Sequence, residues 1–203
     1  MSKYTIDGTR DLASKIRDKS DKVDSYLAST VNKAATFARN RATDVIAGRV
    51  TLQPSYIKQR LQVRKRASPK DPTAIIRGNE RATLLTRYQY TVGKDSVSVK
   101  VNRKGGYENI KRAFKVTNLR GSYATGIAMI NEVAYEYYKG LPLDTPGKKA
   151  KLAKLAKKAK DKPRGIYVLH SRSIDQLFTS AKEDISGELL DFMAEDFLKR
   201  LNS

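Results

Sequence analysis

The sequence predicts an α+β fold in which two long helices pack on an antiparallel β-sheet. A helical apolar repeat runs through residues 21–47, and a second one runs through residues 174–201. Between them lie short segments rich in β-branched and aromatic residues, separated by glycine and proline, as is typical of strands and turns. A chain of 203 residues is long enough for one domain with a substantial core. We therefore expect a single domain, residues 1–203, with basic extended arms.

The composition points to negatively charged partners. The chain has 41 lysines and arginines against 21 aspartates and glutamates, a formal net charge of +20. Such a chain is attracted to polyanions or acidic protein surfaces, and its self-repulsion favours a bound partner or an oligomer. Cysteine is absent, which excludes disulfides and thiolate metal sites. No stretch has the roughly 18 to 20 apolar residues of a membrane span, so we expect no membrane partner.

The first third of the chain predicts an edge strand, a long helix and a short helix. Residues 3–6 have strand composition and precede an Asp7-Gly8 turn signal. The helix over residues 21–47 presents one apolar face, with Gly48 as its expected C-terminal stop. Alanine recurs on this face, so a neighbouring element must approach closely. The face consists of Val23, Leu27, Val31, Ala34, Ala38, Ala42 and Val45.

A short second helix is expected to start at Pro54, because proline suits a first helical turn. Ile57 and Leu61 would form its apolar contact. Residues 60–73 follow as a basic connecting arm or the entrance to a strand, since Pro69 and Pro72 interrupt regular structure.

The middle of the chain predicts an antiparallel meander. Residues 74–77, 84–90 and 97–101 have strand composition, and the last alternates apolar with polar side chains. We expect a short helical or irregular insert at residues 108–112 and another strand at 113–116. Residues 127–138 fit either a helix or a strand, and we favour the strand.

Residues 141–164 predict a lysine-rich loop or arm, because the apolar stripe within them is too narrow to anchor a helix strongly. A strand follows at residues 166–169, and Ser173 then caps the closing helix. The apolar face of that helix should pack on the first long helix, and its outward face is acidic. The buried positions expected are Ile174, Leu177, Phe178, Ala181, Ile185, Leu189, Phe192, Met193 and Phe197.

The sequence does not favour an enzyme, a metal site or a bound cofactor. His170 is the only histidine, and a histidine at a strand end is more often structural than a ligand. No P-loop pattern is present. We expect Tyr135, Tyr137 and Tyr138 to be core or interface residues rather than base-stacking ones.

Two basic runs are candidate contacts, and charge alone favours neither DNA nor an acidic protein as their partner. They comprise Arg60, Arg64, Lys65, Arg66, Lys148, Lys149, Lys151, Lys154, Lys157 and Lys158. The acidic face of the closing helix is the candidate subunit contact, and it includes Glu188, Asp191 and Glu195.

The order of these features resembles the minor tail protein Z family of tailed phages. The resemblance lies in the alanine-rich first helix, the basic sequence of residues 60–67, and the strand and helix start of residues 166–178. In that family a C-terminal helix ends in a Phe-x-x-x-Leu type pattern, which Phe197 and Leu201 match. Relatives often have a Gly-Pro-Ser turn where this chain has residues 170–173.

The resemblance implies a virion protein that is made in the host cytoplasm and completes the tail. Such proteins form a homo-oligomeric ring at the head-proximal end of the tail, joining the tail terminator or tube to neck proteins around the DNA channel. Basic and acidic surfaces on one subunit permit head-to-tail contacts between neighbours. The alternative expectation is a protein that binds nucleic acid without sequence specificity through its basic arms.

Overall fold

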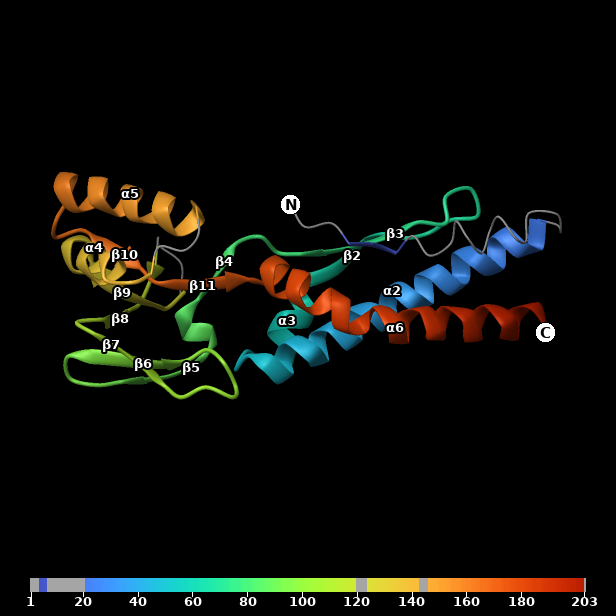
Figure 1. The fold of residues 1–203 in the computed structure, drawn as a ribbon, viewed down its shortest axis with the longest axis horizontal. Coiled ribbons are helices and arrows are strands. Elements are labelled where there is room, and N and C mark those ends of the chain that lie inside the picture. The colour runs from blue at the N-terminus through green and yellow to red at the C-terminus, as the bar shows by residue number, and fades with distance from the viewer. Residues whose placement is uncertain (1–3, 7–20, 120–123, 143–145, 203) are drawn as a thin grey trace. The chain divides into compact units, whose positions relative to one another are not determined.

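The computed structural model describes residues 4–6, 21–119, 124–142 and 146–202 and confirms the α+β fold (Figure 1). Its contacts cluster into two compact units. Unit 1 comprises Met1–Ala82 and Arg172–Ser203, and unit 2 comprises Thr83–Ser171. Of the helices described, none is long and apolar enough to cross a membrane.

Two long helices form the core of unit 1, as the sequence predicts. Helix α2 spans Asp21–Arg49 and helix α6 spans Ile174–Leu201, and they lie side by side along much of their length (Figure 1). The expected stop at Gly48 is wrong, because α2 continues to Arg49. The small side chains of α2 let its neighbours approach closely, and four of them are fully buried: Ala34, Ala35, Ala38 and Ala42.

Paired side chains fix the antiparallel register of α2 and α6. At the centre of the pair, the rings of Phe37 and Phe192 stack with their centroids 4.6 Å apart and their planes 7° from parallel. Three ion pairs join the helices on the solvent side, and their order runs in opposite directions along the two sequences. They are Lys33–Asp196 at 2.8 Å, Arg41–Glu188 at 2.6 Å and Arg49–Asp184 at 2.5 Å.

The start of α6 is set by a reciprocal cap, as the serine in the sequence predicts. The Gln176 backbone N–H donates to Ser173 Oγ at 3.1 Å, and the Ser173 backbone N–H donates to Gln176 Oε1 at 3.0 Å. Two N–H groups that a helix start leaves without partners are thereby satisfied.

Asp196 accepts three hydrogen bonds where α6 meets α2. The donors are Thr30 Oγ1, Lys33 Nζ and Arg200 Nε, at 2.8, 2.8 and 2.6 Å. Burial alone would raise the pKa of this carboxyl, but the hydrogen bonds from Arg200, Lys33 and Thr30 outweigh burial and lower the pKa to about 2. The folded protein therefore favours the charged form of Asp196 more strongly than the unfolded chain does.

Replacing Asp196 with asparagine should lower the free energy of unfolding at pH 7 by about 2 kcal/mol, the difference that this pKa shift represents. Because the folded pKa is depressed, the contribution is present above the ordinary pKa near 3.8 and is lost as the pH falls toward about 2. Urea unfolding of both proteins at pH 7 and pH 2 measures the difference. If the substitution lowered the free energy of unfolding equally at both pH values, the lowered pKa of Asp196 would be contradicted.

A three-stranded antiparallel sheet and a short helix complete unit 1. Residues 61–65, predicted to lie in a connecting arm or a strand entrance, form an edge strand of this sheet, while the predicted short helix and the strand near residue 75 are confirmed. The strand order is β1-β3-β2, with β1 at Tyr4–Ile6, β3 at Ala74–Gly78 and β2 at Leu61–Lys65, and helix α3 spans Pro54–Arg60.

Unit 2 contains the antiparallel meander, but from different strands than predicted. Its sheet has the order β5-β6-β7, with β5 at Gln89–Val92, β6 at Ser96–Lys100 and β7 at Glu108–Lys111. The expected insert at residues 108–112 is therefore wrong, because it is largely strand. The predicted strand at 84–90 is instead divided among β4 at Ala82–Leu84, the 3₁₀ turn η1 at Leu85–Arg87, and β5. Strand β4 pairs with β11 at His170–Ser173.

The second sheet of unit 2 has the order β10-β9-β8 and is accompanied by two helices. The predicted strands near residues 115 and 167 are confirmed, whereas the predicted strand at 127–138 is half right, because a helix follows its first residues. The lysine-rich segment is a helix rather than an extended arm. The bounds are Phe114–Val116 for β8, Gly126–Ile130 for β9, Ile166–Val168 for β10, Asn131–Lys139 for α4 and Pro146–Asp161 for α5.

Candidate functional site

The described residues hold no cluster of three or more histidine, cysteine or carboxylate side chains suited to a metal ion. His170 Nδ1 lies 2.9 Å from the Val168 carbonyl oxygen. Because a carbonyl only accepts hydrogen bonds, Nδ1 carries the proton and donates to it.

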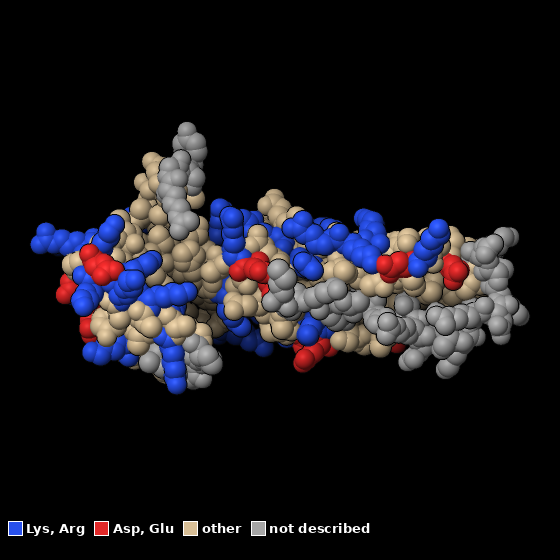
Figure 2. Space-filling view, turned by 90° about the horizontal axis from the view of Figure 1, so that it is seen from above, with Lys and Arg blue, Asp and Glu red and all other residues tan. Residues whose placement is uncertain are grey.

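Among the charged side chains visible in Figure 2, lysine and arginine are far more extensive than aspartate and glutamate, which form small separate groups. The two predicted basic runs fall in different units. The arginine-rich run belongs to unit 1, around β2, and the lysine-rich run belongs to unit 2, on α5. The protein thus has two separate basic surfaces, one in each unit.

Helix α5 is held on α4 by one leucine and by lysines that cover tyrosine rings. Leu155 is fully buried. Lys151 Nζ lies 4.0 Å from the centroid of the Tyr138 ring and donates to the Tyr138 hydroxyl at 2.9 Å. Lys158 Nζ lies 5.5 Å from the centroid of the Tyr167 ring. The apolar side of α5 is narrow when only its apolar residues are counted. The aliphatic stems of the lysines and their cation–π contacts enlarge the surface by which the helix packs.

The tyrosines under α5 form a half-buried cluster rather than a base-stacking platform. The Tyr138 ring meets those of Tyr137 and Tyr167 edge-on, with centroids 5.3 and 5.9 Å away. Burial, together with the hydrogen bond to Glu108, raises the pKa of Tyr137 to about 12. Burial also lowers the pKa of Lys151 from its ordinary value. These tyrosines are uncharged and half-buried beneath α5, and Lys151 is half-buried against them. They are therefore poorly placed to contact a polyanion.

The chain between α5 and β10 is fixed by the first residue of α4. The Asn131 side-chain amide donates to the Lys162 carbonyl at 2.8 Å, and the Asn131 backbone N–H donates to the Gly165 carbonyl at 2.7 Å. A Cβ at Gly165 would lie 2.6 Å from Asn131 Nδ2, so glycine permits this close approach. Helix α5 therefore has a defined position within unit 2.

The outer side of α5 is an exposed cationic surface. Lys149, Lys154, Lys157 and Lys160 are exposed, and no described carboxylate forms an ion pair with any of them. Asp161 is the single acid in the helix sequence. We call these four residues the α5 lysine surface. Lys160 was not among the predicted contact residues, although it belongs to the same lysine run.

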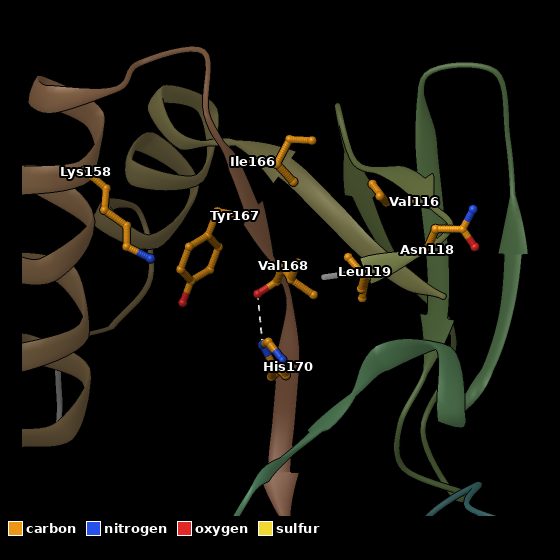
Figure 3. A pocket seen from close by; sticks show the side chains of 8 residues that line it. All are labelled: Val116, Asn118, Leu119, Lys158, Ile166, Tyr167, Val168 and His170. Atoms are coloured by element: carbon orange, nitrogen blue, oxygen red, sulfur yellow. Dashed lines mark hydrogen bonds between the residues drawn. The ribbon is translucent and has the colours of Figure 1, made fainter. Parts of the chain in front are cut away.

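A pocket of about 480 Å³ in unit 2 is lined by one residue of α5, Lys158, together with residues of β8 and β10 (Figure 3). Side chains from β8, β10 and the segment after β8 give it an apolar lining, and Tyr167 lies between β10 and Lys158 in the view of Figure 3. It lacks paired acid and base groups among its lining residues. Those residues are Val116, Asn118, Leu119, Lys158, Ile166, Tyr167, Val168 and His170.

The basic run of unit 1 divides into paired and unpaired residues. The Arg60 guanidinium lies 4.0 Å from the centroid of the Tyr56 ring, and Lys65 forms an ion pair with Asp71. Arg64 and Arg66 are exposed, and within the described part of the chain neither has an ion-pair partner. These two arginines are thus the members of the run that can receive an external carboxylate.

Of the three predicted subunit contacts on α6, one is already paired within the chain. Glu188 binds Arg41 through two hydrogen bonds, of 2.6 and 2.8 Å, and this arginine lowers the pKa of Glu188. Asp191 and Glu195 are exposed and form no ion pair with any residue that the structure describes. Two of the three predicted acidic contacts therefore remain available to a partner.

Comparison of the chain with protein-family models, with characterised proteins and with solved structures gave no match. The resemblance to the phage family stays a prediction from the sequence.

Proposed function

We propose that the protein is a structural component of a tailed-phage virion, a tail completion protein that forms a ring at the head-proximal end of the tail and joins it to the neck around the DNA channel. The α5 lysine surface carries the DNA-facing part of this proposal, because it is a cationic surface held in place within unit 2 and none of its lysines forms an ion pair with a described carboxylate. Asp191 and Glu195, together with Arg64 and Arg66, add complementary charges that neighbouring subunits can use.

The α5 lysine surface is suited to a backbone contact with DNA. Lysine acts as a point charge toward phosphate and reads no base sequence, so such a contact tolerates any DNA that passes through a channel. The surface stands on a 16-residue helix anchored by Leu155 and the tyrosine cluster. Its lysines are therefore presented together and lose little chain entropy on binding.

Replacing Lys149, Lys154, Lys157 and Lys160 with glutamine should weaken binding to duplex DNA of random sequence. If each lysine neutralises one phosphate, the slope of log affinity against log salt should become shallower by roughly 3 to 4. Fluorescence anisotropy over a salt series measures the slope.

The matched control removes the same charge from exposed lysines of the same unit, by glutamine at Lys94, Lys104, Lys111 and Lys115. It should change the slope much less. Equal losses in the two variants would show that net charge, rather than the α5 surface, attracts the DNA.

The α5 surface equally favours a second candidate, an independent protein that binds nucleic acid without sequence specificity. Native mass spectrometry of the wild-type protein, alone and mixed with neck components, separates the two. A protein that binds DNA tightly and remains a monomer in both samples would favour the second candidate over the ring.

A further inference from the structure

The outer face of α6 carries an apolar stripe that the core does not use. Leu190, Leu198 and Leu201 are 57%, 58% and 42% exposed, although they belong to a helix whose other face is buried. With the exposed Ala194 they recur at steps of four and three, which places them on one side of the helix. Exposed apolar residues that line up on one side of a helix form a candidate surface for contact with a partner.

Carboxylates border this stripe. Asp191 and Glu195 follow Leu190 and Ala194 by one position each, so they flank the leucines on the same side. The other described acids on this half of α6 are used within the chain, since Glu188 binds Arg41 and Asp196 binds Lys33 and Arg200. We call the leucines, Ala194 and these two free carboxylates the α6 surface.

The charges of the α6 surface argue against a two-fold contact with itself. A symmetric pair would bring Asp191 and Glu195 of both copies into one interface, and like charges there oppose association. Exposed cationic residues elsewhere in unit 1, such as Arg64 and Arg66, give a second copy a different surface of opposite charge. Contacts between two different surfaces generate rings when the rotation closes.

The exposed arginines beside β2 fit the free carboxylates in charge and spacing. Arg64 belongs to β2 and Arg66 follows the last residue of that strand, so their Cα atoms are at most about 7 Å apart. Asp191 and Glu195 are four residues apart in a helix, about 6 Å. Arginine also binds carboxylates with two parallel hydrogen bonds, and its aliphatic stem can cover a neighbouring leucine.

The pairing of β2 supports a contact through side chains. β2 is an edge strand, and its register with β3 shifts between Val63 and Lys65, so Arg64 lies at a bulge. A bulge in an edge strand disfavours the addition of another strand and redirects a side chain outward. We propose that the α6 surface binds the Arg64 and Arg66 region of a second copy of this chain, head to tail. This inference rests on the proposed ring, and it names the surfaces that build it.

Reversing the charges tests this pairing in the full-length protein. The double substitution Asp191→Arg with Glu195→Arg should weaken self-association at least tenfold, and so should Arg64→Glu with Arg66→Glu. Combining all four should restore association, because the opposite charges face each other again. Sedimentation velocity over a concentration series measures the effect, and circular dichroism confirms that each variant is folded.

A matched control is Asp24→Arg with Glu80→Arg, which makes the same change in net charge at exposed sites of unit 1. It should leave association nearly unchanged. An oligomeric wild type that neither reversal affects would overturn this pairing while the proposed ring stands. A wild type that stays monomeric at every concentration would overturn the proposed oligomer and this pairing with it.

Discussion

Replacing Phe178 with alanine is expected to lower the free energy of unfolding by about 3 to 5 kcal/mol, the usual cost of removing a fully buried aromatic side chain. Phe178 is on α6 and has no exposed surface. Its removal takes apolar contacts from the core of unit 1 and leaves a cavity that a helix held by a cap and three ion pairs can only partly close.

Urea unfolding followed by circular dichroism at 222 nm measures this loss. The control is Phe114→Ala, because Phe114 is 37% exposed at the end of β8 and should cost much less. A loss below about 1 kcal/mol for Phe178→Ala would contradict the assignment of this residue to the core.

The second large effect is expected at Gly78, the last residue of β3, where Gly78→Ala should destabilise the protein by about 3 kcal/mol. A Cβ at this position would lie 2.5 Å from the Asp175 Cα and 2.6 Å from its backbone nitrogen. Backbone atoms cannot turn aside as a flexible side chain can. The Asp175 N–H also donates to the Asn79 carbonyl at 3.2 Å, so a shift of α6 would strain that bond as well.

The same substitution at Gly187 is the matched control, and it should have the opposite sign. Gly187 lies inside α6, and nothing lies within 4 Å of a Cβ built there. Alanine should stabilise this helix by about 0.5 to 1 kcal/mol. Thermal unfolding of both variants gives the comparison, and a Gly78→Ala protein as stable as Gly187→Ala would show that β3 and α6 do not approach this closely.

The long helices could be predicted from the sequence because each carries its own signals. Their apolar periods run for many turns, and Ser173 with Gln176 marks the start of α6. Repeated alanine in α2 also predicted close neighbours, and the helix packs against α6, α3, β2 and β3 with those alanines buried. Signals of this kind depend only on residues that are near in sequence.

The lysine-rich helix and strand β7 could not be predicted in this way, because residues distant in sequence determine them. Helix α5 lacks enough apolar residues, and its contact surface is completed by Tyr138 and Tyr167 under lysine stems. Strand β7 has a single buried residue, Ile110, so it shows no alternation, and pairing with β6 sets its conformation. Tertiary contacts override weak local patterns in both cases.

The sequence predicted which charged runs are candidate contacts, but not which residues within them are free to bind a partner. The sequence shows which side chains are charged, whereas the structure shows which charges already have partners. Glu188 and Lys65 belong to the predicted set and are paired within the chain, while Arg64, Asp191 and Glu195 are not paired with described residues. The stripe of exposed leucines was not predicted from the sequence. Its residues recur at the same three- and four-residue steps as the buried residues of α6, so the sequence alone does not separate the two sets.

We propose that this chain is a ring-forming structural protein, and electron microscopy of the purified protein, alone and with neck and tail components, tests that proposal most directly. We expect closed rings with a central channel, and their position at the head-proximal end of assembled tails. Single copies in every sample, with none incorporated into tails, would contradict the claim.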